Sequence, residues 1–248
     1  SVASPLIVGD EGDLDVPGWG ARVDELVRRT PGGLALGFHD EARLVYDTPA
    51  FDAPSDELPE RRTIHLGADV FGPTGTAVRA PFAGEVVSVV DNDAPLDYGP
   101  TVILRHAPLP GIEWCTLFGH LDREVLMRLA PGESLAAGDL VGHFGPPAHN
   151  GGWTPHLHVQ LLDPSLAPSG DAPGVCAPSD RAVWLALAPD PAPLLGVTCT
   201  RAQRVETETL VAARLARLGP SLSLSYRRPL TIVKGRAQHL YDADGRRY

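Results

Sequence analysis

Two histidines one residue apart, His156 and His158, stand in the strand-like stretch TPHLHVQ (154–160). Successive side chains of a strand alternate between its two faces, so both imidazoles project from one face. Burying two imidazoles beside branched Val159 is costly unless each finds a polar partner. A cation or a reacting amide in front of them would provide that partner, and the pair therefore predicts a chemically active face.

Three further side chains of suitable chemistry precede this pair. His65 and Asp69 stand in HLGAD (65–69), and His120 stands in FGHLD (118–122). A catalytic zinc site uses three nitrogen or oxygen ligands and keeps a fourth position open for water. His65, Asp69 and one histidine of the pair would supply such a set with one carboxylate charge. The two remaining histidines titrate near neutral pH and could donate or accept a proton.

The motifs resemble those of the lysostaphin-type zinc endopeptidases, which cut peptide bonds in peptidoglycan. The resemblance rests on HLGAD, FGHL and PHLHVQ in that order, with GTAVRAPFAGEVV between the first two. It implies zinc (Zn2+) as the cofactor, with His65, Asp69 and His158 as its ligands. It also implies that His120 and His156 orient water and stabilise the oxyanion.

The chain departs from the family pattern at three places. Phe118 stands where a tyrosine is common, and Val159-Gln160 follows H-x-H where Phe-Glu is common. The loop HNGGWTP (149–155) is bulky and is expected to bring Trp153 near the groove. Loops on a rigid scaffold set specificity, so the sequence leaves the substrate open.

Short strands are the elements expected to position these side chains. From about residue 63 to 163, apolar stretches alternate with Gly and Pro turns, as in TVILRH (101–106) and IEWCTLFGHL (112–121) across a turn at 107–111. Such spacing predicts antiparallel pairing. The expected fold class is mainly β, an antiparallel β-sheet core with an open groove, for which the family resemblance implies a lysostaphin/LytM-like arrangement.

An N-terminal extension is expected before this core. Residues 1–18 are acidic and punctuated by Gly and Pro, and are expected to form an arm. WGARVDELVRRTPGG (19–33) has apolar residues at helical spacing and predicts a short helix. LALGFHDEARLVYD (34–47) predicts a hairpin that turns at His39-Asp40-Glu41, and a Pro-rich connector follows at 48–62.

The segment after the core is rich in Pro and Ala, with a short helix expected over 179–187. TRAQRVETETLVAARLARLGP (200–220) predicts a C-terminal helix, because a Thr200/Gln203 capping box opens it and Gly219-Pro220 ends it. Its apolar residues are expected to pack against a neighbouring element: Val211, Leu215 and Leu218.

The last stretch, PLTIVKGRAQHLYDADGRRY (229–248), predicts two strands and ends in strand-like sequence. It faintly resembles the opening hairpin of class III pyridoxal-phosphate (PLP) aminotransferases. The stretch contains no cofactor residue, so this chain would not bind PLP by itself. The resemblance implies that a C-terminal PLP-type domain is covalently linked in a longer fusion protein.

Four parts are therefore expected along the chain. They are an N-terminal extension of arm, helix and hairpin (1–60), a zinc peptidase-like β core (61–165), a Pro/Ala-rich segment with a linker helix (166–220), and the start of a truncated aminotransferase-like domain (221–248).

Composition narrows the partners that the chain can have. Lys plus Arg total 21 against 31 Asp plus Glu, a net charge of −10 at pH 7, which argues against a broad contact with a nucleic-acid backbone. No apolar run reaches the ~18 residues of a membrane span. The three cysteines show no C-x-x-C spacing, which indicates reduced thiols. Without a visible signal pattern, we expect a cytoplasmic protein that contacts neither nucleic acid nor membrane.

The expected function is zinc-dependent hydrolysis of a peptide (amide) bond by a metal-activated water, within a larger multidomain fusion protein. Two alternatives stay open. In one, the domain binds zinc as a non-catalytic binding or scaffold module, its groove closed by the 149–155 loop or by the N-terminal arm. In the other, the site hydrolyses a small metabolite amide made or consumed by a fused PLP-dependent part.

Overall fold

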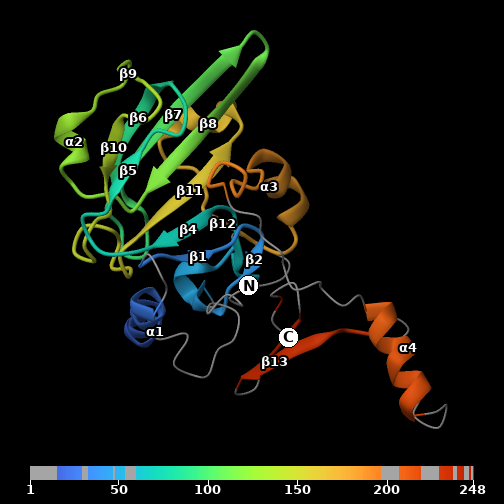
Figure 1. The fold of residues 1–248 in the computed structure, drawn as a ribbon. Coiled ribbons are helices and arrows are strands. Elements are labelled where there is room, and N and C mark those ends of the chain that lie inside the picture. Colours follow the sequence, from blue (N-terminus) through green and yellow to red (C-terminus); the bar gives the residue numbers. More distant parts are fainter. Residues whose placement is uncertain are drawn as a thin grey trace.

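The structure is a computed structural model. It describes residues 16–29, 33–46, 48–53, 60–196, 207–218, 229–236, 239–242, 246 and 248. The main element is a seven-stranded sheet in the spatial order β1-β4-β11-β8-β7-β6-β9 (Figure 1). Its strands are β1 Ala35–Gly37, β4 Ala68–Phe71, β6 Gly84–Asn92, β7 Gly99–Leu109, β8 Ile112–Gly119, β9 Ser134–Leu135 and β11 His156–Leu162.

Three small sheets and several short helices complete the described residues. The small sheets pair β5 (Ala77–Arg79) with β10 (Leu140–His143), β3 (Ile64–His65) with both β2 (Glu41–Ala42) and β12 (Val175–Cys176), and β13 (Ile232–Arg236) with β14 (His239–Asp242). The helices are α1 Val16–Arg29, α2 Val125–Arg128, α3 Arg181–Leu187 and α4 Thr207–Leu218, with 3-10 turns η2 Leu44–Tyr46, η3 Pro49–Phe51 and η4 Pro164–Ser169.

All the strand pairs of the described residues are antiparallel. The mainly β fold class is therefore confirmed. The pairing predicted between the stretches 101–106 and 112–121 is also confirmed, since β7 and β8 form a hairpin with Val102 opposite Phe118. This hairpin is the long projection at the top of Figure 1.

The central strands are buried on both faces of the sheet. Along β7, Val102 and Leu104 enter one apolar cluster, whereas Ile103 enters the cluster on the opposite face. A strand covered on both sides needs apolar residues at successive positions. This explains the unbroken run TVIL in the sequence, and it gives the strands that carry the histidines a rigid support.

The N-terminal segment departs from its predicted form. The α1 helix is present, and its Val23 is fully buried. The hairpin predicted over 34–47 is wrong, because β1 pairs with β4 of the large sheet while β2 pairs with β3 of a small one. The backbone groups of this stretch thus find their partners in two sheets of the core rather than in each other.

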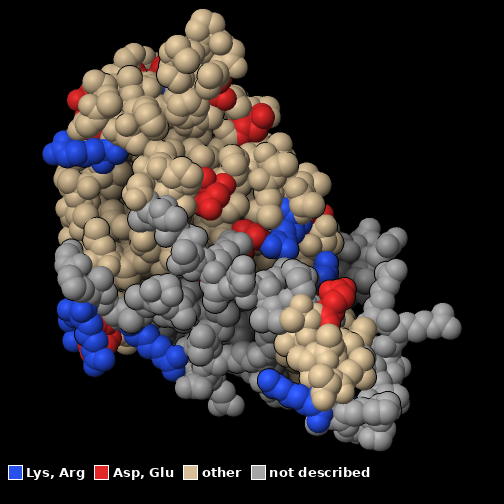
Figure 2. Space-filling model, turned by 45° about the vertical axis from the view of Figure 1, so that its right-hand side comes forward, with Lys and Arg blue, Asp and Glu red and all other residues tan. Residues whose placement is uncertain are grey.

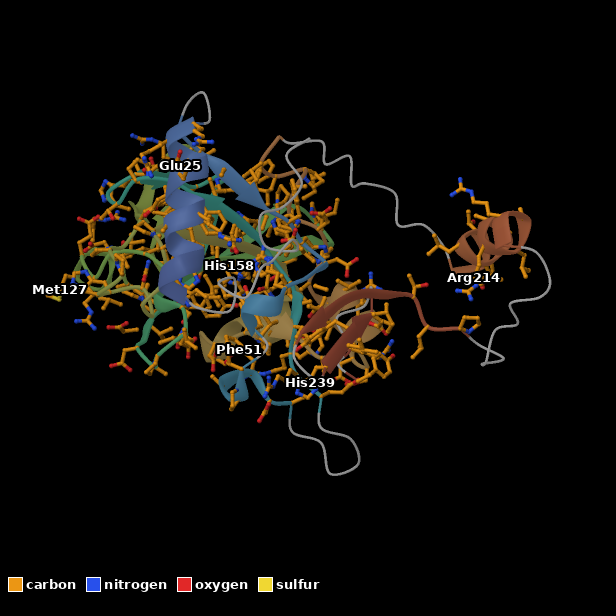
Figure 3. All side chains as sticks on the ribbon, turned by 90° about the horizontal axis from the view of Figure 1, so that it is seen from below. Glu25, Phe51, Met127, His158, Arg214 and His239 are labelled. Atoms are coloured by element: carbon orange, nitrogen blue, oxygen red, sulfur yellow. The ribbon has the colours of Figure 1, made fainter. Side chains whose placement is uncertain are left out.

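The C-terminal elements are present with shifted details. The predicted helix is observed as α4, Thr207–Leu218, and its predicted capping box lies outside the described residues. The expected packing of Leu215 is wrong, because its side chain is 46% exposed on a helix that stands apart from the sheets, as Arg214 marks in Figure 3. The two strands predicted over 229–248 are confirmed as the β13–β14 hairpin.

The surface offers two further facts. On the face in Figure 2, the described Lys, Arg, Asp and Glu side chains are scattered rather than gathered into a patch of one sign. Among the helices of the described residues, none combines the length and apolar character that crossing a membrane requires.

Candidate metal centre

Strand register brings the distant motifs together. Asp69 on β4 lies directly opposite His158 on β11, and His158 lies opposite Gly119 on the other neighbouring strand, β8. His120 follows Gly119 immediately and turns with φ 63°, in the left-handed region that non-glycine residues rarely adopt. His65 reaches the same place from β3, which leads into β4.

The glycine in the middle of HLGAD is required by a close approach. A Cβ atom added at Gly67 would lie 2.5 Å from both Cε1 and Nε2 of His158 and 2.7 Å from the Val159 carbonyl oxygen. No side chain fits at that distance. Gly67 therefore lets the His158 ring lie against the turn that links His65 to Asp69.

Three side-chain atoms converge at this point. His65 Nε2 lies 3.0 Å from His158 Nδ1, His158 Nδ1 lies 3.0 Å from Asp69 Oδ1, and His65 Nε2 lies 3.2 Å from Asp69 Oδ1. Each of the three residues is at most 3% exposed. Among the described residues, this is the group of histidine and carboxylate side chains that could hold a metal ion.

The outward nitrogens of both imidazoles carry their protons. His65 Nδ1 donates to the Phe38 carbonyl oxygen at 2.9 Å, and His158 Nε2 donates to Gln160 Oε1 at 2.9 Å. The Gln160 amide is oriented because its Nε2 donates to the Pro173 carbonyl oxygen at 3.1 Å. In a neutral imidazole only one nitrogen is protonated, so the inward atoms, His65 Nε2 and His158 Nδ1, present lone pairs.

The convergence fits a zinc ion. Two unprotonated nitrogens and a carboxylate oxygen lie within 3.2 Å of one another with no hydrogen atom between them, an arrangement that is repulsive unless a cation balances it. Tetrahedral zinc with ligands at 2.0–2.1 Å separates those ligands by about 3.3–3.5 Å. The donor set, one carboxylate and two imidazoles, is also one that zinc takes.

His120 and His156 form a second pair beside this centre. Their ring centroids are 4.1 Å apart. Each Nδ1 donates to a backbone carbonyl oxygen, that of Asn150 at 3.0 Å and that of Thr154 at 2.7 Å. Each Nε2 is therefore unprotonated and able to accept a proton.

Burial and charge keep these groups in the required protonation states. Burial, and then the charge of Arg43, lower the pKa of His65 to about 3. Burial also lowers the pKa of His156 and, together with His156, holds the pKa of His120 well below its ordinary value. Burial alone would raise the pKa of Asp69, but His65 and Arg43 outweigh it and hold that pKa well below the usual range. At neutral pH, His65, His120 and His156 are therefore neutral, and the Asp69 carboxylate is charged.

A cavity of about 310 Å³ opens in front of both sets of histidines. Its walls include all five predicted site residues, His65, Asp69, His120, His156 and His158. Trp153 from the 149–155 loop lies in the wall, packed edge-on against Tyr46 with ring centroids 6.1 Å apart. His158 lies deep inside the body of the protein in Figure 3.

The residues behind the centre are not marked by any pattern in the sequence. Arg43, 1% exposed, donates from Nη1 to Asp69 Oδ2 at 2.5 Å, and Glu41 accepts from its Nε at 2.8 Å. An arginine in a short polar stretch is usually a solvent-facing residue, and no spacing rule marks this one. Gln160, noted only as a departure from the family pattern, is the partner of His158.

Comparison with known proteins agrees with this geometry. Residues 63–167 match the sequence model of peptidase family M23. This stretch is similar to the peptidase M23 domain. The matched range holds the five predicted site residues, whereas Arg43 and Glu41 precede it. A search of curated proteins found no match.

Several solved structures of peptidases and related proteins resemble the chain distantly. The catalytic domain of the antimicrobial peptidase lysostaphin from Staphylococcus simulans is 18% identical, with a TM-score of 0.42 over 70% of this chain and 98% of that one. A mutant catalytic domain of the prophage-encoded M23 protein EnpA from Enterococcus faecalis is 23% identical, with a TM-score of 0.36 over 55% of this chain and 85% of that one. A zinc-containing peptidase from Vibrio cholerae is 22% identical, with a TM-score of 0.33 over 50% of this chain and 36% of that one.

Proposed function

We propose that this protein is a zinc metallopeptidase that hydrolyses a peptide (amide) bond, with peptidoglycan peptides as its substrate class. The observation that carries the proposal is the convergence of three unprotonated, buried donor atoms within 3.2 Å of one another. The match of residues 63–167 to peptidase family M23 supports the reaction class and the kind of substrate.

His65 Nε2, Asp69 Oδ1 and His158 Nδ1 would hold the zinc ion. When bound, zinc would supply Lewis-acid polarisation of the peptide carbonyl and would lower the pKa of a water molecule toward neutrality. The residues themselves need little rearrangement, because the outward hydrogen bonds to Phe38 and Gln160 already fix both rings.

His120 and His156 would move the proton. Both line the cavity, and both are neutral with a free Nε2, so either can accept a proton from the attacking water. The protonated imidazole can then stabilise the negative charge that develops on the carbonyl oxygen and can return the proton to the leaving amine. His156 Nε2 lies 3.9 Å from Asp69 Oδ1, near enough for the carboxylate to favour its charged form.

Metal analysis and a cleavage assay test this function. The zinc-replete protein should contain one zinc ion per chain, and it should release new amino groups from peptidoglycan fragments in a manner that a chelator abolishes and zinc restores. A protein that holds no zinc would contradict the proposal at its first step. A protein that holds zinc but cleaves neither peptidoglycan fragments nor small acyl-amino compounds would be a binding module instead.

The fused PLP-type domain and a cytoplasmic location stay predictions. The hairpin that the aminotransferase resemblance expects is formed by β13 and β14, but a two-stranded hairpin is too common a motif to identify a family. Comparing turnover on peptidoglycan fragments with turnover on small acyl-amino compounds separates the proposed peptidase from an amidase coupled to such a domain.

A further inference from the structure

The two oxygens of the Asp69 carboxylate face different partners. Oδ1 faces the convergent nitrogens of His158 and His65, at 3.0 and 3.2 Å. Oδ2 accepts from Arg43 Nη1 at 2.5 Å. The cavity wall includes Asp69, but Arg43 is not part of it, so the guanidinium lies behind the carboxylate and away from any substrate.

We infer that Arg43 is a positioning residue that makes Asp69 a one-oxygen ligand of the metal. This inference rests on the proposed function. A carboxylate can bind zinc through one oxygen or through both, and a hydrolytic site must keep one coordination position open for water. A charge-assisted hydrogen bond to a buried guanidinium is among the strongest that a carboxylate makes, so Oδ2 stays with Arg43 and the open position is kept.

Arg43 is itself held rigidly by the segment that precedes the M23 domain. Its Nε donates to Glu41 Oε2 at 2.8 Å, its Nη1 also donates to the Tyr46 hydroxyl at 3.0 Å, and its Nη2 reaches the Phe38 carbonyl oxygen at 3.4 Å. Glu41 is 5% exposed. Because Glu41 balances the charge of Arg43, the pair adds no net charge beside the metal.

The same segment also holds a second proposed ligand. The Phe38 carbonyl oxygen accepts from His65 Nδ1, and β2 places Glu41 opposite His65 in its small sheet. Residues 38–46 thus fix both His65 and Asp69 from behind. Partners of this kind orient metal ligands, and their removal typically changes metal affinity or activity by about 10–100-fold.

The test variant is the double substitution Arg43→Met/Glu41→Gln. Arg43→Met alone would leave Glu41 buried and unpaired, which destabilises proteins strongly, whereas the double variant removes both charges together. With Oδ2 released, Asp69 can offer both oxygens. We expect the variant to bind zinc at least as tightly as the wild type, while turnover of peptidoglycan fragments falls by about 10–100-fold.

Cobalt provides a readout that does not depend on activity. Four-coordinate cobalt absorbs visible light more strongly than five-coordinate cobalt, so a second carboxylate oxygen on the ion should weaken the visible absorption of the cobalt-loaded variant. Arg43→Lys retains a cation for Oδ2 but not the planar fork, and it should restore most of the wild-type spectrum.

Arg181→Met is the matched control. Arg181 forms an ion pair with Asp40 of the same segment, at 2.6 and 2.7 Å, but neither residue contacts Asp69. This variant should keep the wild-type cobalt spectrum. An unchanged spectrum and unchanged turnover in the double variant would overturn the inference about Arg43 alone, and so would loss of metal binding in that variant. Absence of metal from the wild type would instead overturn the proposed function.

Discussion

His65 shares one hydrogen-bond arrangement with His120 and His156, although its proposed role differs from theirs. In His65, His120 and His156, Nδ1 donates to a backbone carbonyl oxygen and Nε2 is left unprotonated. His65 Nε2 lies 3.2 Å from Asp69 Oδ1, whereas the nearer of the other two, His156 Nε2, lies 3.9 Å away. A carboxylate in direct contact therefore distinguishes a proposed metal ligand from a proposed base that has the same tautomer.

Removing a histidine that is a proposed zinc ligand should have the largest effect. In His158→Ala, the proposed zinc site would lose one of its three ligands, so bound zinc and peptidase activity should both fall to background. Zinc content and amino-group release from peptidoglycan fragments measure this. His149→Ala is the control, because His149 pairs with Asp122 outside the cavity wall. Full zinc content in His158→Ala would contradict the distinction between the proposed zinc ligands and the proposed proton carriers.

Removing one histidine of the second pair, His120 and His156, should separate zinc binding from turnover. His120→Ala should keep its zinc, because His120 is not one of the three convergent groups, while turnover falls by about 10²–10⁴-fold with the loss of a proton carrier. His120→Gly should fall equally, although glycine adopts the φ of 63° without strain. Recovery of activity in His120→Gly would show that the backbone, not the imidazole, matters at this position.

Gly67→Ala should weaken zinc binding without removing a proposed ligand. The added Cβ would lie 2.5 Å from the His158 ring, so the ring must move and zinc affinity should fall by about 10–100-fold. Competition with a chelator measures the change. Gly142→Ala is the matched control, since its Cβ would meet Leu121 at an ordinary 3.4 Å. Equal zinc affinity in both variants would contradict the close-approach argument.

The metal-free protein should lose stability as the pH falls from 7 to 5. His65, His120 and His156 have folded-state pKa values below the ordinary 6.5, so below that value the unfolded chain binds protons that the folded chain does not. The free energy of unfolding should fall by roughly 2 kcal/mol at pH 5 for each histidine that stays neutral. Urea unfolding of chelator-treated protein measures this, and a flat profile would contradict the buried, neutral assignment.

The resemblance of three short motifs, in order, to the lysostaphin-type family selected five residues, and the structure brings these five to one cavity. Alternation along a strand places His156 and His158 on one face, and fixed register then brings Asp69 opposite His158. The pairing of β7 with β8 was predictable for the same reason, because a short turn joins neighbouring strands. Alternation and short turns are local rules that single stretches of sequence obey, whereas the register of β4 against β11 joins residues 89 positions apart.

Partners distant along the chain could not be predicted in this way. The stretch 34–47 has the alternation of two strands, but alternation does not say which strand accepts their hydrogen bonds, and β1 and β2 join different sheets. Arg43 was missed because its second acidic partner, Asp69, is 26 residues away in the sequence and reaches it only after folding. Leu215 shows the opposite error, since helical spacing predicts an apolar face but not a neighbour to cover it.

The hydrogen bond from His65 to the Phe38 carbonyl oxygen has a practical consequence. A shortened gene cut at Thr63, where the family match begins, would encode every proposed ligand yet discard the wall that orients two of them. Such a recombinant fragment should express as a β-sheet protein with a poorly ordered zinc pocket. Low zinc affinity or activity of this fragment would then result from the missing residues 38–46 and would not represent the longer protein.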